Sequence, residues 1–353
     1  MKLLIITMGP GETSQGVAFG AEAIRGKHDV TFGIILESNI HFLDGLSGIK
    51  KLILDNGEKI KQEIATGQYD VVVFCNSKTF GKDKEFHTKA PKNKPFVVSL
   101  DSNWLFNQPE QFPFISWLDK IYLNFPQDVY ENGLISGGGQ YFIPKDVSDR
   151  ILPIGLIPSY KPLDEVEKEK VRNQLGLQLD QKLIFTYVGS SVTYRKDFYQ
   201  KYLTVFDTLY KQFPEIKVVF LSGEEPNRPW IHKTGGQASS DNFYKFLASA
   251  DLVFQHQGLG TLEQAISAQV PVIANVLRPD EHEKTHTHAW EVEPFVRAGL
   301  CKMHYYDDET NKIIESIKSL LFSDSRKNMI QTQKKHYSRG EETMLDDIKK
   351  LVS

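Results

Sequence analysis

The sequence has few cysteines, no long apolar run and no excess of charge of either sign. Its 353 residues include two cysteines, Cys75 and Cys301, too few for a disulfide framework. No apolar run approaches the roughly 20 residues of a membrane span, and the N-terminal run is too short for a signal peptide. A formal net charge of −3 offers no basic surface for nucleic acid. We therefore expect a soluble, cytoplasmic protein with buried cysteines and no nucleic-acid partner.

Short apolar runs alternate with helical patterns along most of the chain. The strand-like runs are Leu3–Thr7, Val30–Ile35, Val71–Cys75, Phe96–Leu100, Lys120–Leu123, Leu183–Val188, Lys217–Leu221, Leu252–Phe254 and Val272–Asn275. Helical patterns lie between many of them, as at Val17–Arg25, Phe198–Phe213 and Phe243–Ser249. This alternation predicts an α/β protein whose parallel sheets are covered by helices on both faces.

The series of strands restarts in the middle of the chain. Residues 151–162 hold three prolines and a glycine, which is typical of an extended linker, and we place the domain boundary near 155–163. The expected parts are an N-terminal domain at 1–155, a C-terminal domain at 164–335, and a final helix at 336–353 that packs back on the first domain. Two such Rossmann-like domains face each other across a cleft and bind ligands at the carboxyl ends of their strands.

The most informative segment is Ala250–Ile273, which predicts a strand, a glycine-bearing turn, a helix and a further strand. The turn runs from His256 to Thr261, and the helix is expected to begin near Gly260 and to end before Pro271. Free N–H groups at such a helix N-terminus bind phosphate. A dinucleotide turn usually lies in the first strand–helix unit of a chain. The turn from His256 to Thr261 lies much later in the chain, so we expect the nucleotide site in the second domain.

The run HQGLGTLEQAISAQVP resembles the donor-site motif of nucleotide-sugar glycosyltransferases of the GT-B fold. That family includes the UDP-sugar transferases of plants and animals and the bacterial transferase that adds N-acetylglucosamine to lipid I. Its pattern is His-x-Gly-x-Asn/Gly-Ser/Thr-x-x-Glu, then Gly-x-Pro. The matching residues are His256, Gly258, Gly260, Thr261 and Pro271. The resemblance implies that His256, Gly260 and Thr261 contact the diphosphate of a donor, most simply a UDP-sugar.

Other segments match the same family in order and spacing. Ser190 and Ser191 stand in a loop that faces the phosphates in the family, and Gly11 belongs to a run that resembles its first glycine-rich loop. Asp280 and Glu281 stand where the family contacts the donor sugar. The resemblance therefore implies a nucleotide-sugar donor as substrate, with no metal ion and no other cofactor.

The sequence departs from the family pattern at three positions. Gln264 replaces the Glu that holds the ribose hydroxyls, so this contact becomes neutral. Gln269 replaces a glycine, at a cost of about 1 kcal/mol if the backbone is left-handed there. Glu12 stands after the N-terminal glycines, where many relatives have a His. These departures therefore bear most on which donor the protein binds and on which residue is the catalytic base.

Transfer of a sugar to an acceptor hydroxyl requires a base, which we expect from the N-terminal domain. Glu12 is the first candidate and Asp101, after the strand Phe96–Leu100, is the second. Glu12 has a plainer interpretation, as a solvated residue or one that stabilises the start of the following helix. The amides of 258–261 can balance the charge of the leaving diphosphate without a metal.

Three functions remain open at this point. The first is an inverting, metal-independent glycosyltransferase, since the chain lacks the Glu-x7-Glu pattern of retaining relatives: Glu263 is present but position 271 is Pro. The second is a nucleotide-sugar epimerase of the same fold. The third is a nucleotide-sugar-binding protein without catalysis. The acceptor, whether small molecule, glycan or lipid-linked, is not legible in the sequence.

Two further patterns have competing interpretations. His282–His286 matches the zinc-protease pattern HExxH, but its flanks are polar and no third ligand follows at a recognised spacing. The aromatic stretch Asn103–Trp117 can line an acceptor pocket or touch a lipid surface. Simple packing under a long loop explains the stretch equally well, and the sequence does not establish membrane contact.

Overall fold

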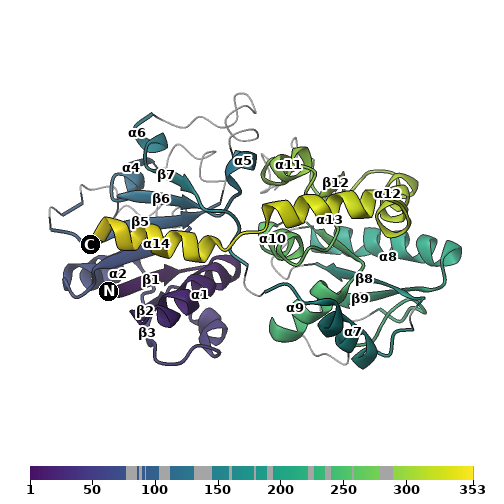
Figure 1. Cartoon of the computed structure of the whole chain (residues 1–353), viewed down its shortest axis with the longest axis horizontal. Helices are drawn as coiled ribbons and strands as arrows, with labels where there is room; N and C mark the ends of the chain where they lie inside the picture. Colours follow the sequence, from purple (N-terminus) through teal and green to yellow (C-terminus); the bar gives the residue numbers. More distant parts are fainter. Residues whose placement is uncertain are drawn as a thin grey trace. The chain divides into compact units, whose positions relative to one another are not determined.

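The structure is a computed structural model of the whole chain, which folds into two compact units (Figure 1). Unit 1 comprises Met1–Ser159 with Ser338–Ser353, and unit 2 comprises Tyr160–Tyr337. The described residues are 1–76, 86, 90–91, 93–102, 112–130, 145–158, 161–178, 180–188, 194–221, 226–234, 240–256, 258–278 and 289–352.

Unit 1 is built on a parallel sheet of seven strands in the order β3-β2-β1-β4-β5-β6-β7. The strands are β1 (Lys2–Thr7), β2 (Asp29–Ile34), β3 (Lys50–Ile53), β4 (Val71–Cys75), β5 (Phe96–Asp101), β6 (Lys120–Leu123) and β7 (Ile151–Pro153). The direction in which strands are added reverses between β1 and β4. In doubly wound sheets, ligands bind outside the carboxyl ends of the strands at this switch point.

The helices of unit 1 include one from the far end of the chain. They are α1 (Pro10–Arg25), η1 (Glu37–Leu43), α2 (Gly57–Ala65), α4 (Phe112–Ile115), α5 (Gln127–Val129), α6 (Lys145–Ser148) and α14 (Gly340–Val352). Figure 1 shows α14 beside α1, and Met344, Leu345 and Ile348 of α14 are buried in the core of this unit. Asp347 accepts hydrogen bonds from Lys120 Nζ at 2.6 Å and from the Tyr122 hydroxyl at 2.8 Å.

Unit 2 has a parallel sheet of five strands in the order β12-β11-β10-β8-β9. The strands are β8 (Lys182–Tyr187), β9 (Ile216–Leu221), β10 (Leu252–His256), β11 (Val272–Val276) and β12 (Lys302–Tyr305). The helices are α7 (Glu165–Gln174), α8 (Arg195–Gln212), α9 (Ser240–Ser249), α10 (Leu259–Ser267), α11 (Ala289–Arg297), α12 (Thr310–Phe322) and α13 (Ser325–His336). In this order the switch point lies between β8 and β10.

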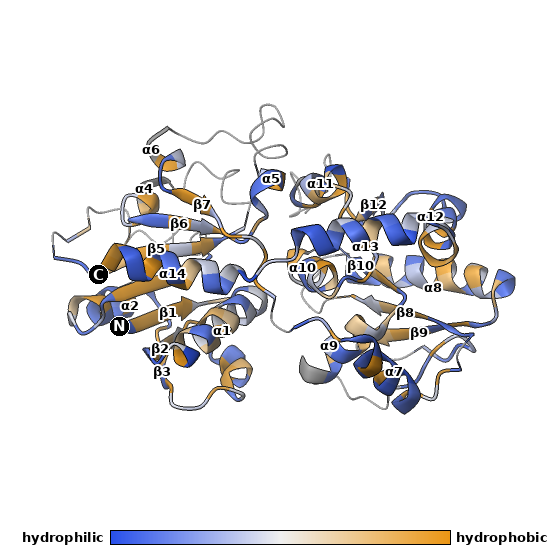
Figure 2. Ribbon diagram, viewed as in Figure 1, coloured by the Kyte–Doolittle hydropathy of each residue, from blue (hydrophilic) through white to orange (hydrophobic). Residues whose placement is uncertain are grey.

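The central strands of both sheets are apolar and buried between helices that carry polar residues on their outer faces (Figure 2). The core of unit 2 is rich in aromatic rings on the α8 side of the sheet. Tyr202 of α8 meets Phe254 of β10 edge to face at 4.6 Å between ring centroids, and Phe206 meets Phe254 at 5.7 Å. This aromatic layer fixes α8 on the sheet and thereby the carboxyl ends of β8 and β10.

The two parallel α/β sheets predicted from the sequence are confirmed, with two local corrections. Helix α1 begins at Pro10 rather than near Val17, so Gly11 and Glu12 lie in a helical first turn and not in a loop. Proline suits the first helical position because the missing N–H has no helical partner there. Ile151–Pro153, expected to be linker, is strand β7 and pairs with β6. Pro153 ends this edge strand, where no N–H is required.

The structure also settles smaller expectations for the described residues. Cys75 and Cys301 are buried, and burial raises the pKa of both thiols. None of the described helices is both long and apolar enough to cross a membrane. Phe114 and Trp117 are buried, and each packs edge to face against Phe86 at 5.3 Å. This part of the aromatic stretch is therefore core, and 103–111 lies outside the described residues.

The burial of His304 predicts that the stability of unit 2 falls in mild acid. Its Nδ1 lies 3.1 Å from Asp308 Oδ2 and its Nε2 2.8 Å from Ser316 Oγ. Burial lowers the pKa of His304, although the hydrogen bond with Asp308 raises it in part. The unfolded chain therefore binds this proton at higher pH than the folded one. We expect the unfolding free energy to be fully retained above about pH 6.5 and to fall as the pH drops below it.

Thermal unfolding between pH 7.5 and 5.5 tests this expectation, with His304→Gln as the comparison. The variant keeps a polar side chain but has no titrating ring, so its melting temperature should depend less on pH. Equal pH dependence in the two proteins would assign the acid sensitivity to other groups.

Candidate functional site

The turn between β10 and α10 exposes the N-terminus of a helix. Gly258 is the N-cap residue with φ 127°, a conformation that glycine adopts without strain. No side-chain cap is formed, and the first turn of α10 contains no acidic residue. A Cβ added at Gly258 or Gly260 would meet none of the described atoms within 4 Å. The amides of this first turn, which have no helical partner, are therefore open to an anionic ligand.

His256 bridges the two strands that flank the switch point of unit 2. It is the last residue of β10, and its Nδ1 lies 3.2 Å from the backbone oxygen of Tyr187, the last residue of β8. A carbonyl oxygen only accepts, so Nδ1 carries a proton. The imidazole is held further by ring contacts with Tyr187 at 5.8 Å and Phe198 at 6.1 Å. The ring is thereby held at the carboxyl edge of the sheet, next to the first turn of α10.

Gln255 lies beneath the same turn and was missed by sequence reasoning. Its side chain is fully buried, and Nε2 donates a hydrogen bond to the Gly258 carbonyl at 3.3 Å. A polar side chain at the end of the apolar run Leu252–Phe254 is the signal that marks it. This bond ties the peptide of Gly258 to the sheet and so steadies the open turn.

The exposed side of α10 brings together the other predicted donor contacts. Gly260 is exposed, while Thr261 and Gln264 are partly buried and share one side of the helix by their spacing of three. Glu263 is buried. Gln264 Oε1 has no hydrogen-bond partner among the described residues. Gln264, rather than Glu263, therefore lies on the same side of the helix as Thr261, although its Oε1 is buried.

Unit 1 gathers its two candidate carboxylates at the carboxyl edge of its own sheet. Glu12, in the first turn of α1, accepts a hydrogen bond on Oε1 from Asn76 Nδ2 at 2.5 Å. Asn76 directly follows β4, so the bond spans the switch point between β1 and β4. Asp101 ends β5 and is 1% exposed. Burial, followed by the charges of Glu12 and Asp101, raises the pKa of the Cys75 thiol, so both carboxylates lie near it.

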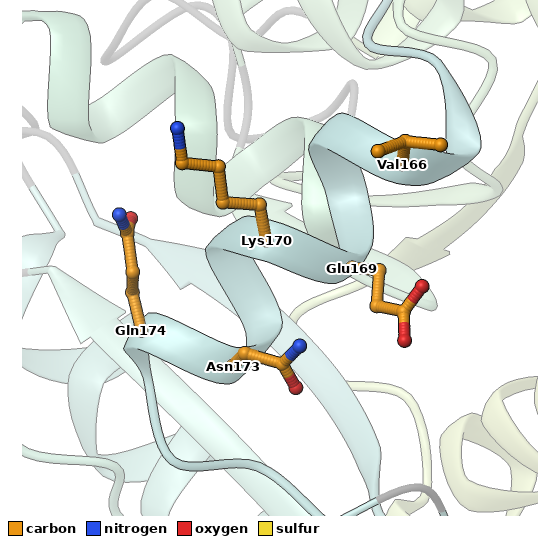
Figure 3. A pocket seen from close by; sticks show the side chains of 5 residues that line it. All are labelled: Val166, Glu169, Lys170, Asn173 and Gln174. Atoms are coloured by element: carbon orange, nitrogen blue, oxygen red, sulfur yellow. The ribbon is translucent and has the colours of Figure 1, made fainter.

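Several predicted residues fall outside the described part of the chain. These are Ser190, Ser191, Asp280, Glu281 and the HExxH segment His282–His286. Among the residues that are described, no group of three or more His, Cys, Asp or Glu side chains is placed to hold a metal ion. A shallow hollow beside α7 involves none of the predicted residues. It is lined along one helix by Val166, Glu169, Lys170, Asn173 and Gln174 (Figure 3).

Comparison with known proteins finds similarity in fold without similarity in sequence. No protein-family model matches the chain, and no curated protein matches it. Solved structures match along the whole length. The S. aureus MnaA–UDP structure is 14% identical with a TM-score of 0.69, covering 99% of this chain and 96% of that one. The UDP-GlcNAc 2-epimerase from Neisseria meningitidis bound to UDP-GlcNAc is 16% identical with a TM-score of 0.62, covering 100% of both chains.

A glycosyltransferase is similar to the same degree. SnogD from Streptomyces nogalater is 14% identical with a TM-score of 0.63, covering 100% of this chain and 99% of that one. Identities this low establish the fold alone. The chain has the GT-B fold of two Rossmann-like domains, which nucleotide-sugar glycosyltransferases and UDP-GlcNAc 2-epimerases share.

Proposed function

We propose that this protein is an enzyme that binds a nucleoside-diphosphate sugar through unit 2 and transfers the sugar to an acceptor hydroxyl. The observation that carries the proposal is the open glycine turn at the N-terminus of α10, placed at the switch point of the five-stranded sheet. That position and those free amides suit a diphosphate. Structures of the same fold that are described with bound UDP or UDP-GlcNAc support the choice of a UDP-sugar.

In this proposal different residues of unit 2 bind different parts of the donor. The first-turn amides of α10, with His256 and Thr261, bind the diphosphate, and Gln264 binds the ribose hydroxyls. The family pattern assigns the remaining contacts to residues outside the described part. Ser190 and Ser191 would add hydroxyl donors to the phosphates, and Asp280 and Glu281 would bind the sugar. Fixed donors of this kind stabilise the leaving diphosphate without a metal ion.

Unit 1 supplies the base in the same proposal. The acceptor oxygen attacks the anomeric carbon while the bond to the nucleoside diphosphate breaks on the opposite side, so the configuration inverts. The proton of the acceptor hydroxyl passes to the Glu12 carboxylate. Glu12 is preferred to Asp101 because its side chain is only partly buried, whereas Asp101 is 1% exposed. A base must reach its proton within hydrogen-bond distance.

Nucleotide-sugar epimerisation is the second candidate, and a specific observation favours it. Structures of UDP-GlcNAc 2-epimerases match this chain over 97% or more of its length. An epimerase needs no acceptor, and its product is an isomeric sugar or sugar nucleotide.

A panel of UDP-, dTDP- and GDP-sugars separates these functions. We expect slow release of free UDP from a UDP-sugar in the absence of acceptor, because water then takes the acceptor's place, and faster release when an acceptor is present. Formation of an isomeric sugar would instead establish the epimerase. Tight nucleotide binding without turnover, with or without acceptors, would leave a binding protein and contradict the enzymatic proposal.

His256 provides a separate check of the diphosphate site. Its ring is held at the end of β10 by the Tyr187 carbonyl, beside the first turn of α10. His256→Ala should weaken UDP binding about tenfold, the loss of one charge-assisted hydrogen bond.

Calorimetric titration of the wild type and of His256→Ala with UDP measures this difference in affinity. Unchanged affinity in His256→Ala would remove this residue from the diphosphate site.

A further inference from the structure

Asn76 combines an unfavourable backbone conformation with a directed side chain. It follows β4 with φ 72°, in the left-handed region that glycine occupies freely and most other residues avoid. Its N–H donates to the Leu100 carbonyl at 2.8 Å, which continues the ladder between β4 and β5. Asparagine tolerates this conformation better than most residues. Strained positions of this kind are concentrated at functional sites, and here the side chain shows what the position serves.

The Asn76 amide is directed at the carboxylate of Glu12. Nδ2 lies 2.5 Å from Glu12 Oε1, across the β1–β4 switch point and 64 residues away in sequence. The carboxylate is also confined from the other side. A Cβ on Gly9, the N-cap of α1, would lie 2.2 Å from Glu12 Oε2. The lack of a side chain at Gly9 thus leaves the space that this carboxylate occupies.

We propose that Asn76 is a positioning residue for Glu12, an inference that rests on the proposed function, in which Glu12 is the base. The amide binds Oε1 and holds the carboxylate in one rotamer, the one in which it accepts the proton of the acceptor hydroxyl. Holding a flexible glutamate in its reactive geometry before substrate arrives lowers the entropic cost of reaction. A glycine would satisfy the backbone here without strain, so the amide is what asparagine contributes.

Two substitutions of Asn76 distinguish the effect of its side chain from the effect of its backbone conformation. Asn76→Gly keeps the left-handed conformation and removes the amide. We expect kcat for UDP release from the accepted UDP-sugar to fall about 10- to 100-fold, a part of the roughly 10²- to 10⁴-fold that a general base contributes, with an unchanged KM and an unchanged or higher Tm. Asn76→Asp brings two carboxylates together. We expect it to be less active than Asn76→Gly at pH 8 and to recover at acid pH, where one protonated carboxyl donates to the other.

Lys27→Gly is the matched control, because Lys27 is exposed at the other end of α1 with φ 60°. It relieves the same kind of backbone strain away from the site, and it should raise Tm slightly and leave kcat unchanged. Crystal structures of the wild type and of Asn76→Gly supply a readout independent of turnover. The Glu12 side chain should occupy one conformer in the first and several in the second.

The outcomes distinguish a positioning role of Asn76 from a purely structural one. Full kcat in Asn76→Gly, or the same single Glu12 conformer, overturns the proposal. A fall in kcat accompanied by a raised KM and a lowered Tm would also overturn it, because that combination reports a structural role. Failure of the wild type to act on any nucleotide sugar sinks the proposed function instead, and the Glu12 conformers still decide whether Asn76 positions that side chain.

Discussion

Gly260→Glu should weaken UDP binding by about 100-fold or more and at the same time raise the melting temperature of unit 2. Gly260 is exposed in the first turn of α10, and a Cβ there meets none of the described atoms within 4 Å. Replacing a helical glycine stabilises by about 0.5–1 kcal/mol, and a carboxylate at a helix N-terminus adds about 0.3–1 kcal/mol. The same carboxylate occupies the amides that we assign to the diphosphate. We expect affinity for UDP to fall at least 100-fold, about 2.7 kcal/mol.

Thermal melting with and without UDP measures both the stability of the free protein and its binding of UDP, because the melting temperature rises with the concentration of a bound ligand. Gly260→Ala is the control: it should raise the melting temperature of the free protein and retain most of the UDP-dependent shift. A full UDP-dependent shift in Gly260→Glu would mean that the nucleotide does not bind at the N-terminus of α10.

Glu12→Gln is expected to lower kcat by about 10²–10⁴ and to leave UDP affinity unchanged. The size follows from the loss of a general base. The amide oxygen of glutamine can still accept the hydrogen bond from Asn76 Nδ2, so the side chain keeps its place but accepts no proton. Because unit 2 holds the nucleotide in our proposal, its affinity should not respond. Single-turnover rates and calorimetric titration with UDP give the two quantities separately.

Asp101→Asn is the matched comparison. It removes the second carboxylate at the same sheet edge while keeping its shape. If Glu12→Gln turns over nearly normally and Asp101→Asn is inactive, the base is Asp101. Because Asp101 is 1% exposed, the melting temperature of this variant must be measured alongside its activity.

The segment around α10 could be predicted because its information is local. Three apolar residues, a glycine turn and an amphipathic helix follow one another within Leu252–Ser267, and each obeys a short-range preference. The left-handed conformation considered for Gln269 is found, with φ 60°. The prediction was less accurate where tertiary contacts override local pattern. Strand β3 is an edge strand with two exposed lysines, and α13 buries little apolar surface, so neither carries a clear periodicity.

By itself, the sequence determined that this protein is made of two parallel α/β sheets and that a glycine turn leading into a helix N-terminus lies in the second. Both follow from apolar periodicity and glycine placement, which act over a few residues. Only the tertiary structure decided the order of the strands, and with it the switch point of each sheet. It also decided the pairs that meet there: Glu12 with Asn76, and His256 with Tyr187, which are 64 and 69 residues apart. Such pairs depend on how strands are arranged side by side in space, which short-range preferences do not encode.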